Sequence, residues 1–177
     1  LDCPMCRTPL DKTQLQIISP ETMDLTNRLG TKMTRLIEYS KDIISLDADN
    51  RIIIFSQWDS MLKLISKNLK NNDVNHLTLN GSYNTINSKL RKFKLDSSIR
   101  ILLLSSDKAA SGLNLTEANH IILMDTLNND PDTSKIIESQ AIGRAVRIGQ
   151  TKNVQVKRFI MANTIEEEFY NKYISIN

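Results

Sequence analysis

Arg51-Ile-Ile-Ile-Phe55 is the stretch of sequence that decides the fold class. This short, continuous apolar run follows the turn residues Asp49-Asn50, and runs of this kind are typical of strands buried on both faces of a parallel sheet. A helix from about Asp59 to Lys70 is predicted next, because its apolar residues recur on one face. A strand followed directly by an amphipathic helix is the first part of a βαβ unit.

The same alternation extends in both directions from this stretch. One helix is expected to start upstream, with Thr31 as a plausible N-cap. Downstream, we predict strands at 76–79, 99–104, 120–124 and 154–160, with helices over about 85–93, 132–146 and from 164 onward. Because short strands alternate with longer helices, the sequence predicts an α/β fold of three layers, with a central parallel sheet and helices on both faces.

The composition is that of an ordinary globular domain. The chain has 177 residues, of which 40% are hydrophobic and 24% are charged. No apolar run approaches the ~20 residues that a membrane span needs, so no membrane partner is expected. The net charge of +3 is too small to indicate nucleic acid by itself, although it permits a local basic face. Cys3 and Cys6 are the only cysteines, which argues against a disulfide scaffold and for an intracellular protein.

The loops that follow the strands are the first place to look for function. In parallel sheets, ligands bind where the carboxyl ends of the strands run into loops. In this sequence those loops are 56–58, 80–83, 105–115 and 125–132.

The most informative segment lies outside these loops. It is Gln140-Ala-Ile-Gly-Arg-Ala-Val-Arg-Ile-Gly-Gln150, in which Arg144 and Arg147 are predicted to lie on one side of a helix end. Paired guanidinium groups suit a polyphosphate, because each is permanently charged and can bond phosphate oxygens in a fork. Two arginines at this spacing could equally be a solvated basic helix end, so the residues alone leave both interpretations open.

Five collinear segments together resemble one family. The Gln140–Gln150 string is similar to the sixth helicase motif of the Swi/Snf-type ATPases. Four further segments match that family's motifs in the right order, namely Ile52–Trp58, Leu79–Ser82, Leu102–Thr116 and Thr164–Glu167. The resemblance covers roughly residues 30–174. It implies two RecA-like lobes, with ATP and Mg²⁺ bound in the cleft between them.

The resemblance concerns the second lobe, which we assign to residues 31–177. The phosphate loop Gly-Lys-Thr and the acidic Mg²⁺ motif of the first lobe are missing from the sequence, so the chain alone is expected to hydrolyse no ATP. By resemblance, Arg147 is an arginine finger with Arg144 as its partner, and these two are the candidate catalytic residues. The candidate nucleotide contacts are Gln140, Gly112 and Asn114.

The resemblance also implies a nucleic-acid surface, with DNA as the expected track and RNA as a possible one. The implied contacts to the strand backbone are Ser56, Gln57, Gly81, Ser82, Ser105 and Lys108. Hydroxyls, small residues and free N–H groups suit phosphates, and they position a strand without determining its sequence. Two alternatives stay open: Ser56-Gln57 could cap the following helix, and Gly81 could serve only as a turn glycine.

Some departures from the family pattern resemble its RING-bearing subgroup. They include Lys108-Ala-Ala-Ser-Gly112, Val146 and Asn80. Cys3-Pro-Met-Cys6-Arg7 is similar to the last zinc-ligand pair of a RING finger, so residues 1–30 are expected to be a linker with the tail of a truncated RING. Zinc needs four ligands and would be held only by an intact RING. The expected partners are the first lobe and, through the RING, a ubiquitin-conjugating enzyme. The alternative function is a RING ubiquitin-ligase scaffold without motor activity, and the location is nuclear if the source is eukaryotic.

Four other features carry weaker expectations. Trp58 is expected to be a packing anchor rather than a base-stacking platform. Asp125 could face the cleft or cap a helix. His76 and His120 are expected to hold no ligand, and Glu166-Glu167-Glu168 to complement a helix dipole.

Overall fold

The computed structural model describes residues 30–105, 113–126 and 131–174, and within them it confirms the predicted α/β fold. Its helices are α2 (Thr31–Leu46), α3 (Asp59–Asn71), α4 (Tyr83–Leu95), α6 (Pro131–Ile142) and α7 (Ile165–Ile174). Its strands are β1 (Ile52–Ser56), β2 (His76–Thr78), β3 (Ile101–Ser105), β4 (His120–Leu123) and β5 (Gln155–Arg158). The predicted linker at 1–30 and the two cysteines fall almost wholly outside the described residues.

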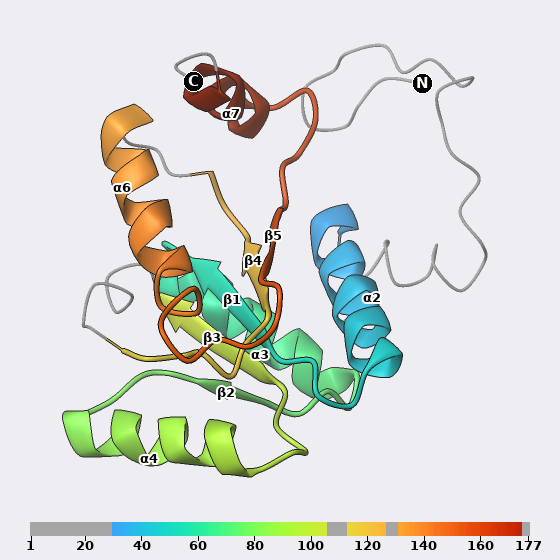
Figure 1. Cartoon of the computed structure of the whole chain (residues 1–177). Coiled ribbons are helices and arrows are strands. Elements are labelled where there is room, and N and C mark those ends of the chain that lie inside the picture. Colours follow the sequence, from blue (N-terminus) through green and yellow to red (C-terminus); the bar gives the residue numbers. More distant parts are fainter. Residues whose placement is uncertain (1–29, 106–112, 127–130, 175–177) are drawn as a thin grey trace.

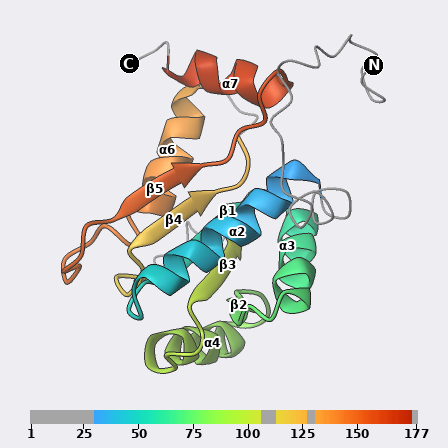
Figure 2. The same cartoon turned by 90° about the vertical axis from the view of Figure 1, so that its right-hand side faces the viewer.

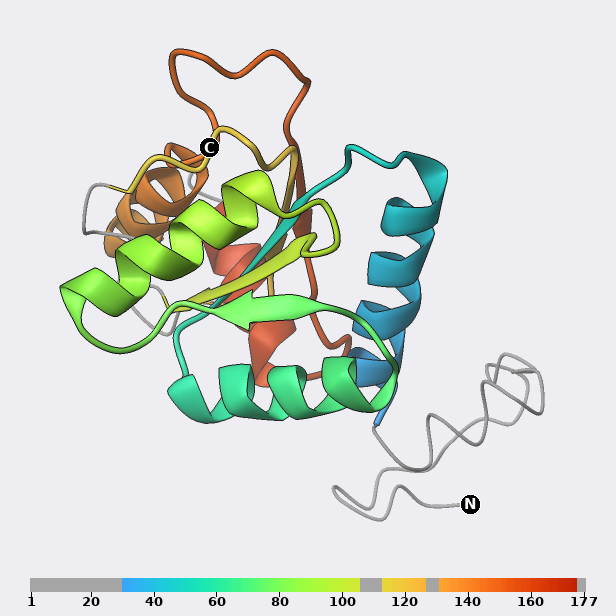
Figure 3. The ribbon, with the colours of Figure 1, turned by 90° about the horizontal axis from the view of Figure 1, so that it is seen from below.

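The strands form one parallel sheet in the order β2-β3-β1-β4-β5 (Figure 1). The strand β1 lies at the centre with all five residues buried, as its apolar sequence predicts. The strand β2 is at one edge, and Figure 3 looks directly onto it. Since β1 and β3 are adjacent and parallel, their last residues, Ser56 and Ser105, are partners in the register. The carboxyl ends of the strands therefore meet along one edge of the sheet.

Helices cover both faces, so the domain has three layers. On one face, Ile53 and Phe55 of β1 belong to a core cluster with residues of α4 and α6. On the other face, Ile52 and Ile54 belong to a second cluster with residues of α2 and α3. Figure 2 shows α2 in front of the sheet and α6 behind it. This alternation follows from the two-residue period of a strand.

The last helix is fastened to the first one. The Lys32 ammonium pairs with both carboxylate oxygens of Glu166 at 2.7 and 2.6 Å, and the rings of Tyr39 and Phe159 meet edge to face at 6.0 Å. Thr164 caps the start of this helix, since its Oγ1 accepts a hydrogen bond from Glu166 N at 3.3 Å. The acidic start of α7 therefore forms an ion pair in addition to its favourable position at a helix N-terminus.

Two helix boundaries differ from the prediction. Thr31 was expected to be the N-cap of the first helix, but the N-cap is Gly30, whose positive φ of 77° suits a residue without Cβ. The helix predicted over 132–146 ends at Ile142, so Arg144 and Arg147 lie in a series of turns rather than at the end of a helix. Gly143 favours this early end, because glycine in a helix costs about 1 kcal/mol relative to alanine.

The remaining differences are small. The strands predicted at 76–79 and 154–160 are shorter, and α4 is longer than the predicted 85–93 because Ser82 is its N-cap.

Candidate nucleotide and nucleic-acid surfaces

The loop after β1 is held by the carboxylate of Asp125, which follows β4. Asp125 Oδ2 accepts hydrogen bonds from Ser56 Oγ at 2.6 Å and from the backbone N–H of Gln57 at 2.8 Å. Ser56 Oγ in turn accepts from the N–H of Trp58 at 3.0 Å. Since Ser56 is only 2% exposed, its hydroxyl holds the loop in place and is not presented to a ligand. Asp125 thus joins the ends of two neighbouring strands.

Gln57 and Trp58 are the residues of this loop that reach the surface. Gln57 is partly exposed, and its side-chain amide donates to Thr126 O at 3.1 Å. Trp58 is 55% exposed. The prediction that Trp58 is a packing anchor is therefore wrong. Trp58 is the N-cap of α3 through its backbone, since its carbonyl oxygen accepts a hydrogen bond from Leu62 N at 3.1 Å, so the start of the helix does not need the ring.

The loop after β2 is also fixed by local hydrogen bonds. Gly81 has a φ of 103°, and a Cβ there would lie 3.2 Å from Thr85 Cγ2. Ser82 is the N-cap of α4 and is exposed, with its Oγ 3.0 Å from Thr85 Oγ1. Lys89 reaches back from α4 and donates to Thr78 O at 2.8 Å. Gly81 therefore forms the turn, while Ser82 lies at the surface.

The loop after β3 is only partly described. Ser105 is 6% exposed, so its side chain, like that of Ser56, is inside the domain. Asn114 is exposed, whereas Lys108 and Gly112 lie outside the described residues. Of the six expected strand contacts, the carboxyl edge thus presents Gln57, Gly81 and Ser82 at the surface, with the two buried serines beneath them.

The arginine turn, which we define as residues 143–149, lies at the C-terminal end of α6. The second half of this helix borders the carboxyl edge, where Ile137, Glu138 and Ala141 line a small pocket together with Gln57 and Asp125. The turn is joined to the segment before β4 by a hydrogen bond from Leu115 N to Arg144 O at 2.9 Å. The structure therefore brings Arg144 next to the segment that contains Asn114.

The side chains of this turn are accessible to a partner. Arg147 is exposed and Arg144 is partly exposed. Val146 and Ile148, which flank Arg147, are 53% and 99% exposed. Gln140, in the last turn of α6, is exposed as well. A guanidinium group surrounded by exposed aliphatic side chains is suited to an interface with another domain.

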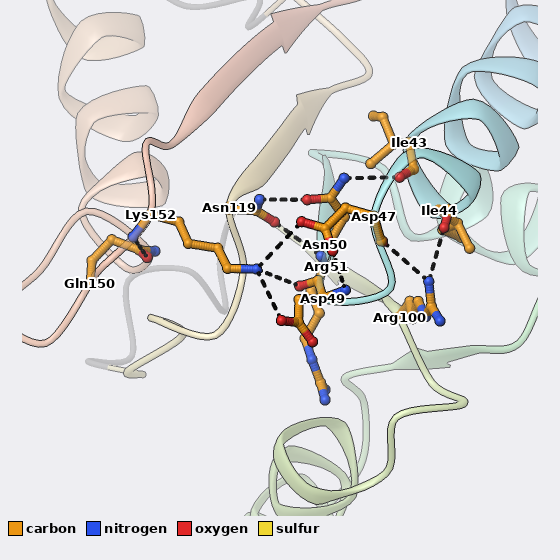
Figure 4. Close-up of polar contacts among 10 residues, drawn as sticks. All are labelled: Ile43, Ile44, Asp47, Asp49, Asn50, Arg51, Arg100, Asn119, Gln150 and Lys152. Carbon is orange, nitrogen blue, oxygen red and sulfur yellow. Dashed lines mark hydrogen bonds and ion pairs between the residues drawn. The ribbon is translucent and has the colours of Figure 1, made fainter.

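Sequence reasoning missed the role of Gln150, the last residue of the motif string. Its Nε2 donates to Ala118 O at 2.8 Å and to Ala145 O at 3.2 Å. Its Oε1 accepts from Lys152 N at 2.9 Å (Figure 4). Gln150 thereby ties the arginine turn to the residues that precede β4 and β5. A glutamine directly after a Gly-containing turn is the only sequence signal that could have indicated this role.

Two buried asparagines, Asn50 and Asn119, form further hydrogen bonds at the amino edge of the sheet, where the strands begin. Asn119 Nδ2 donates to Asn50 Oδ1 at 2.8 Å, and Asn50 Nδ2 donates to Ile43 O at 2.9 Å (Figure 4). Asn119 Oδ1 accepts from Arg51 N at 3.0 Å. Buried polar groups with satisfied hydrogen bonds make a local structure rigid. The arginine turn therefore rests on a connected amide network that reaches α2.

Two further polar groups are buried near these surfaces. Glu138 of α6 accepts from Arg158 Nε at 3.1 Å and from Arg158 Nη2 at 2.6 Å, which ties α6 to β5. Burial lowers the pKa of His120 below its usual range, and the nearby Lys152 ammonium acts in the same direction. The Nδ1 of His120 has no hydrogen-bond partner among the residues that the structure describes.

Within the described ranges, no three His, Cys, Asp or Glu side chains are grouped closely enough to hold a metal ion. Over the same part of the chain, no helix has the length and apolar character needed to cross a membrane.

A parallel sheet in this strand order, with an exposed arginine turn packed against the segment before β4, defines the class: this is a RecA-like α/β domain of the helicase type. The chain belongs to the family described as the helicase conserved C-terminal domain, whose model matches residues 32–149. The part of a solved structure described as the C-terminal part of the Fun30 ATPase domain is similar, with a TM-score of 0.74 and 29% identity over 89% of this chain and 48% of that one.

Curated relatives point to the same family. DNA repair protein RAD5A of Arabidopsis thaliana is 33% identical over 172 residues, which are 93% of this chain and 16% of the relative. The E3 ubiquitin-protein ligase SHPRH of Homo sapiens is 30% identical over 174 residues, 94% of this chain and 10% of the relative. An ATP-dependent helicase of Schizosaccharomyces pombe is 38% identical over 140 residues, 78% of this chain and 13% of the relative.

These matches confirm the resemblance to Swi/Snf-type ATPases of the RING-bearing subgroup. The chain spans between 10% and 16% of the length of these curated relatives.

Proposed function

We propose that this chain is the second motor lobe of an ATP-dependent translocase that moves along nucleic acid, with double-stranded DNA as the track. The observation that carries the proposal is the 2.9 Å hydrogen bond between Leu115 and Arg144, because it joins the segment of the fifth motif to the arginine turn of the sixth. Family membership and the helicase and DNA-repair relatives support the same function.

The nucleotide side of the mechanism uses the arginine turn. ATP, held together with Mg²⁺ mainly by a first RecA-like lobe, would provide the phosphoryl group that water accepts. Arg147 is the group that reaches across, because it is exposed, and Arg144 assists from its partly exposed position. Gln140 and Asn114 are exposed and are assigned to the nucleotide side, and Gly112, which lies outside the described residues, is assigned there from its position in the fifth motif. A finger of this kind is worth about 10³–10⁵ in rate because it stabilises charge on the transferring group.

The nucleic-acid side uses the carboxyl edge of the sheet. Gln57, Gly81 and Ser82 are accessible there, and their amide, backbone and hydroxyl groups suit phosphate oxygens. Ser56 and Ser105 act beneath them by holding the loops, while Lys108 adds a positive charge to the loop after β3. Because α6 and the central strand share one core cluster, closure of the two lobes on ATP would move the strand contacts together with the arginine turn that follows α6.

A second activity is proposed for the intact protein. The similarity to an E3 ubiquitin-protein ligase favours a RING finger that recruits a ubiquitin-conjugating enzyme, with zinc held by that RING. Cys3 and Cys6 would be its last ligand pair. The DNA-repair relatives from eukaryotes favour a nuclear location. In the alternative version of this proposal, the helicase lobe is a scaffold and the RING alone is active.

The experiment that tests the proposal compares ATP hydrolysis by the full-length protein with and without a 30-base-pair duplex, and by the 177-residue chain alone. We expect the duplex to stimulate ATP hydrolysis by the full-length protein and the 177-residue chain alone to hydrolyse no ATP. As a measure of movement along the duplex, the full-length protein should also displace the third strand from a DNA triplex. Turnover by the chain alone would contradict the one-lobe assignment. A full-length protein that hydrolyses ATP at the same rate with and without duplex would support the scaffold alternative instead.

A further inference from the structure

The positive charge of this protein is concentrated in one continuous segment. Residues 59–95 contain seven Lys and Arg residues and two Asp residues, which gives +5, whereas the whole chain carries 23 Lys and Arg residues and 20 Asp and Glu residues, which gives +3. The rest of the chain therefore carries a net charge of −2. This segment comprises α3, β2 and α4.

The segment forms one side of the molecule. The strand β2 is the edge strand, and α3 and α4 pack on opposite faces of the sheet. Figure 3 shows β2 between these two helices. Both helices begin at the carboxyl edge, directly after Trp58 and Ser82. The two helices therefore adjoin the carboxyl edge at their starts, while Lys70, Arg91 and Lys92 lie toward their other ends.

Several cations on this side are exposed and unpaired. Lys63, Lys67 and Lys70 recur every three or four residues, so they form one row along α3, and all three are exposed. Arg91 and Lys92 are exposed on α4. None of these five forms an ion pair or a side-chain hydrogen bond with the described residues.

The other cations of the segment serve the fold. Lys94 forms an ion pair with Glu117 at 2.8 Å, and Lys89 donates to the backbone of the loop after β2. A solvated helix face normally carries charges of both signs. On α3 the row Lys63, Lys67 and Lys70 is preceded by a single acidic residue, Asp59, and its three cations form no ion pair with the described residues, which favours an external polyanion as the partner.

We propose that the β2 side, formed by Lys63, Lys67 and Lys70 of α3 with Arg91 and Lys92 of α4, is a second phosphate-binding surface for a nucleic-acid duplex. It deepens the proposed function, on which it rests for the identity of the track. Each lysine replaces counterions at a phosphate, so the surface adds affinity without adding sequence preference. It holds the duplex beyond the motif loops, while the ATPase step is left to the arginine turn.

The chemistry favours nucleic acid over an acidic protein. A protein interface has a core of clustered apolar or aromatic side chains. Along the α3 row the exposed large hydrophobic side chain is Leu64, at 48%. The other exposed large hydrophobic side chains of this side, Trp58, Tyr83 and Leu95, lie at the ends of the two helices and not among the lysines of the row.

The test measures binding of a fluorescein-labelled, mixed-sequence 30-base-pair duplex to the full-length protein by fluorescence anisotropy over a series of salt concentrations. Each phosphate contact contributes a factor of about 8 at 0.1 M salt, so Lys63→Glu/Lys67→Glu should weaken binding about 60-fold. The slope of log K against log salt should fall by about 2. The matched control is Lys157→Glu/Lys172→Glu, which makes the same change in net charge at two exposed positions on β5 and α7. It should bind almost as tightly as the unchanged protein.

Two further measurements separate the possible outcomes. At saturating duplex, the Lys63→Glu/Lys67→Glu variant should hydrolyse ATP at the unchanged maximal rate, because its arginine turn is intact. Equal duplex affinity in both double variants would overturn the proposal. It would also be overturned if the Lys63→Glu/Lys67→Glu variant lost binding to poly-glutamate, a mimic of an acidic protein, but still bound the duplex normally. Because the anisotropy measurement needs no ATP, it tests duplex binding by this surface even if the full-length protein proves not to be a motor.

Discussion

Replacing Asp125 with alanine should lower the free energy of unfolding by about 3 kcal/mol, because two hydrogen bonds to a carboxylate are lost and each is worth at least about 1.5 kcal/mol. Both bonds go to the same atom, Oδ2, from Ser56 Oγ and Gln57 N. The buried hydroxyl of Ser56 would keep only the more distant acceptor Trp58 O, at 3.3 Å, for its proton. Urea unfolding of the 177-residue chain, followed by circular dichroism, measures the loss.

A second variant, Asp125→Asn, separates the contribution of the hydrogen bonds from that of the negative charge. Its amide oxygen can replace Oδ2 and accept both bonds, so only the charge assistance disappears. Charge-assisted bonds are roughly twice as strong as neutral ones, so the cost should be about 1.5 kcal/mol, half that of alanine. Equal losses for the two variants, or no loss for either, would refute the conclusion that this single carboxylate oxygen holds the loop after β1.

Two predictions concern the arginine turn and the amino edge. Gln150→Ala should lower the maximal rate of duplex-stimulated ATP hydrolysis about 100-fold, because a misplacement of the arginine turn by about 1 Å has an effect of that size. The affinity for the duplex should be unchanged. The control variant Asn50→Ala leaves every hydrogen bond of Gln150 in place and should hydrolyse ATP at the unchanged rate. Since the folded-state pKa of His120 is lowered, the unfolded state binds more protons below about pH 6.5, and the stability contributed by the neutral ring should be lost as the pH falls through that region. Urea unfolding at about pH 7 and at about pH 5 measures the free energy of unfolding that is lost on acidification. This loss should be smaller for His120→Gln, which lacks the buried ring, than for His76→Gln, which keeps it; equal losses would contradict the burial argument.

The elements that could be predicted from the sequence are those in which a continuous run of apolar residues indicates burial. The apolar runs of β1 and β3 are buried over all five residues, so their composition is sufficient to identify them as strands. The strand β5 was predicted too long because Gln155–Arg158 alternates between exposed and half-buried residues, which leaves its ends without a local signal. The order of the motifs along the chain was enough to indicate the family.

The parts that escaped prediction depend on contacts between distant residues. Ser56 and Asp125 are 69 positions apart, and only folding shows that the serine hydroxyl is used internally. The end of α6 at Ile142 is followed at once by the bond between Arg144 and Leu115, which no local pattern encodes. The exposure of Trp58 likewise depends on how the loop around it is held.

The most direct test of the motor assignment is steady-state ATP hydrolysis by the full-length protein carrying Arg147→Ala, measured at saturating duplex. The loss of a finger is expected to reduce the stimulated rate by about 10³ or more. The melting temperature should stay within about 2 °C, because the side chain is exposed and surface substitutions cost little. The matched control, Arg35→Ala, removes a 70% exposed guanidinium from α2 and should hydrolyse ATP at the unchanged rate. Normal stimulated turnover by the Arg147→Ala protein would contradict the assignment of this lobe as the source of the finger.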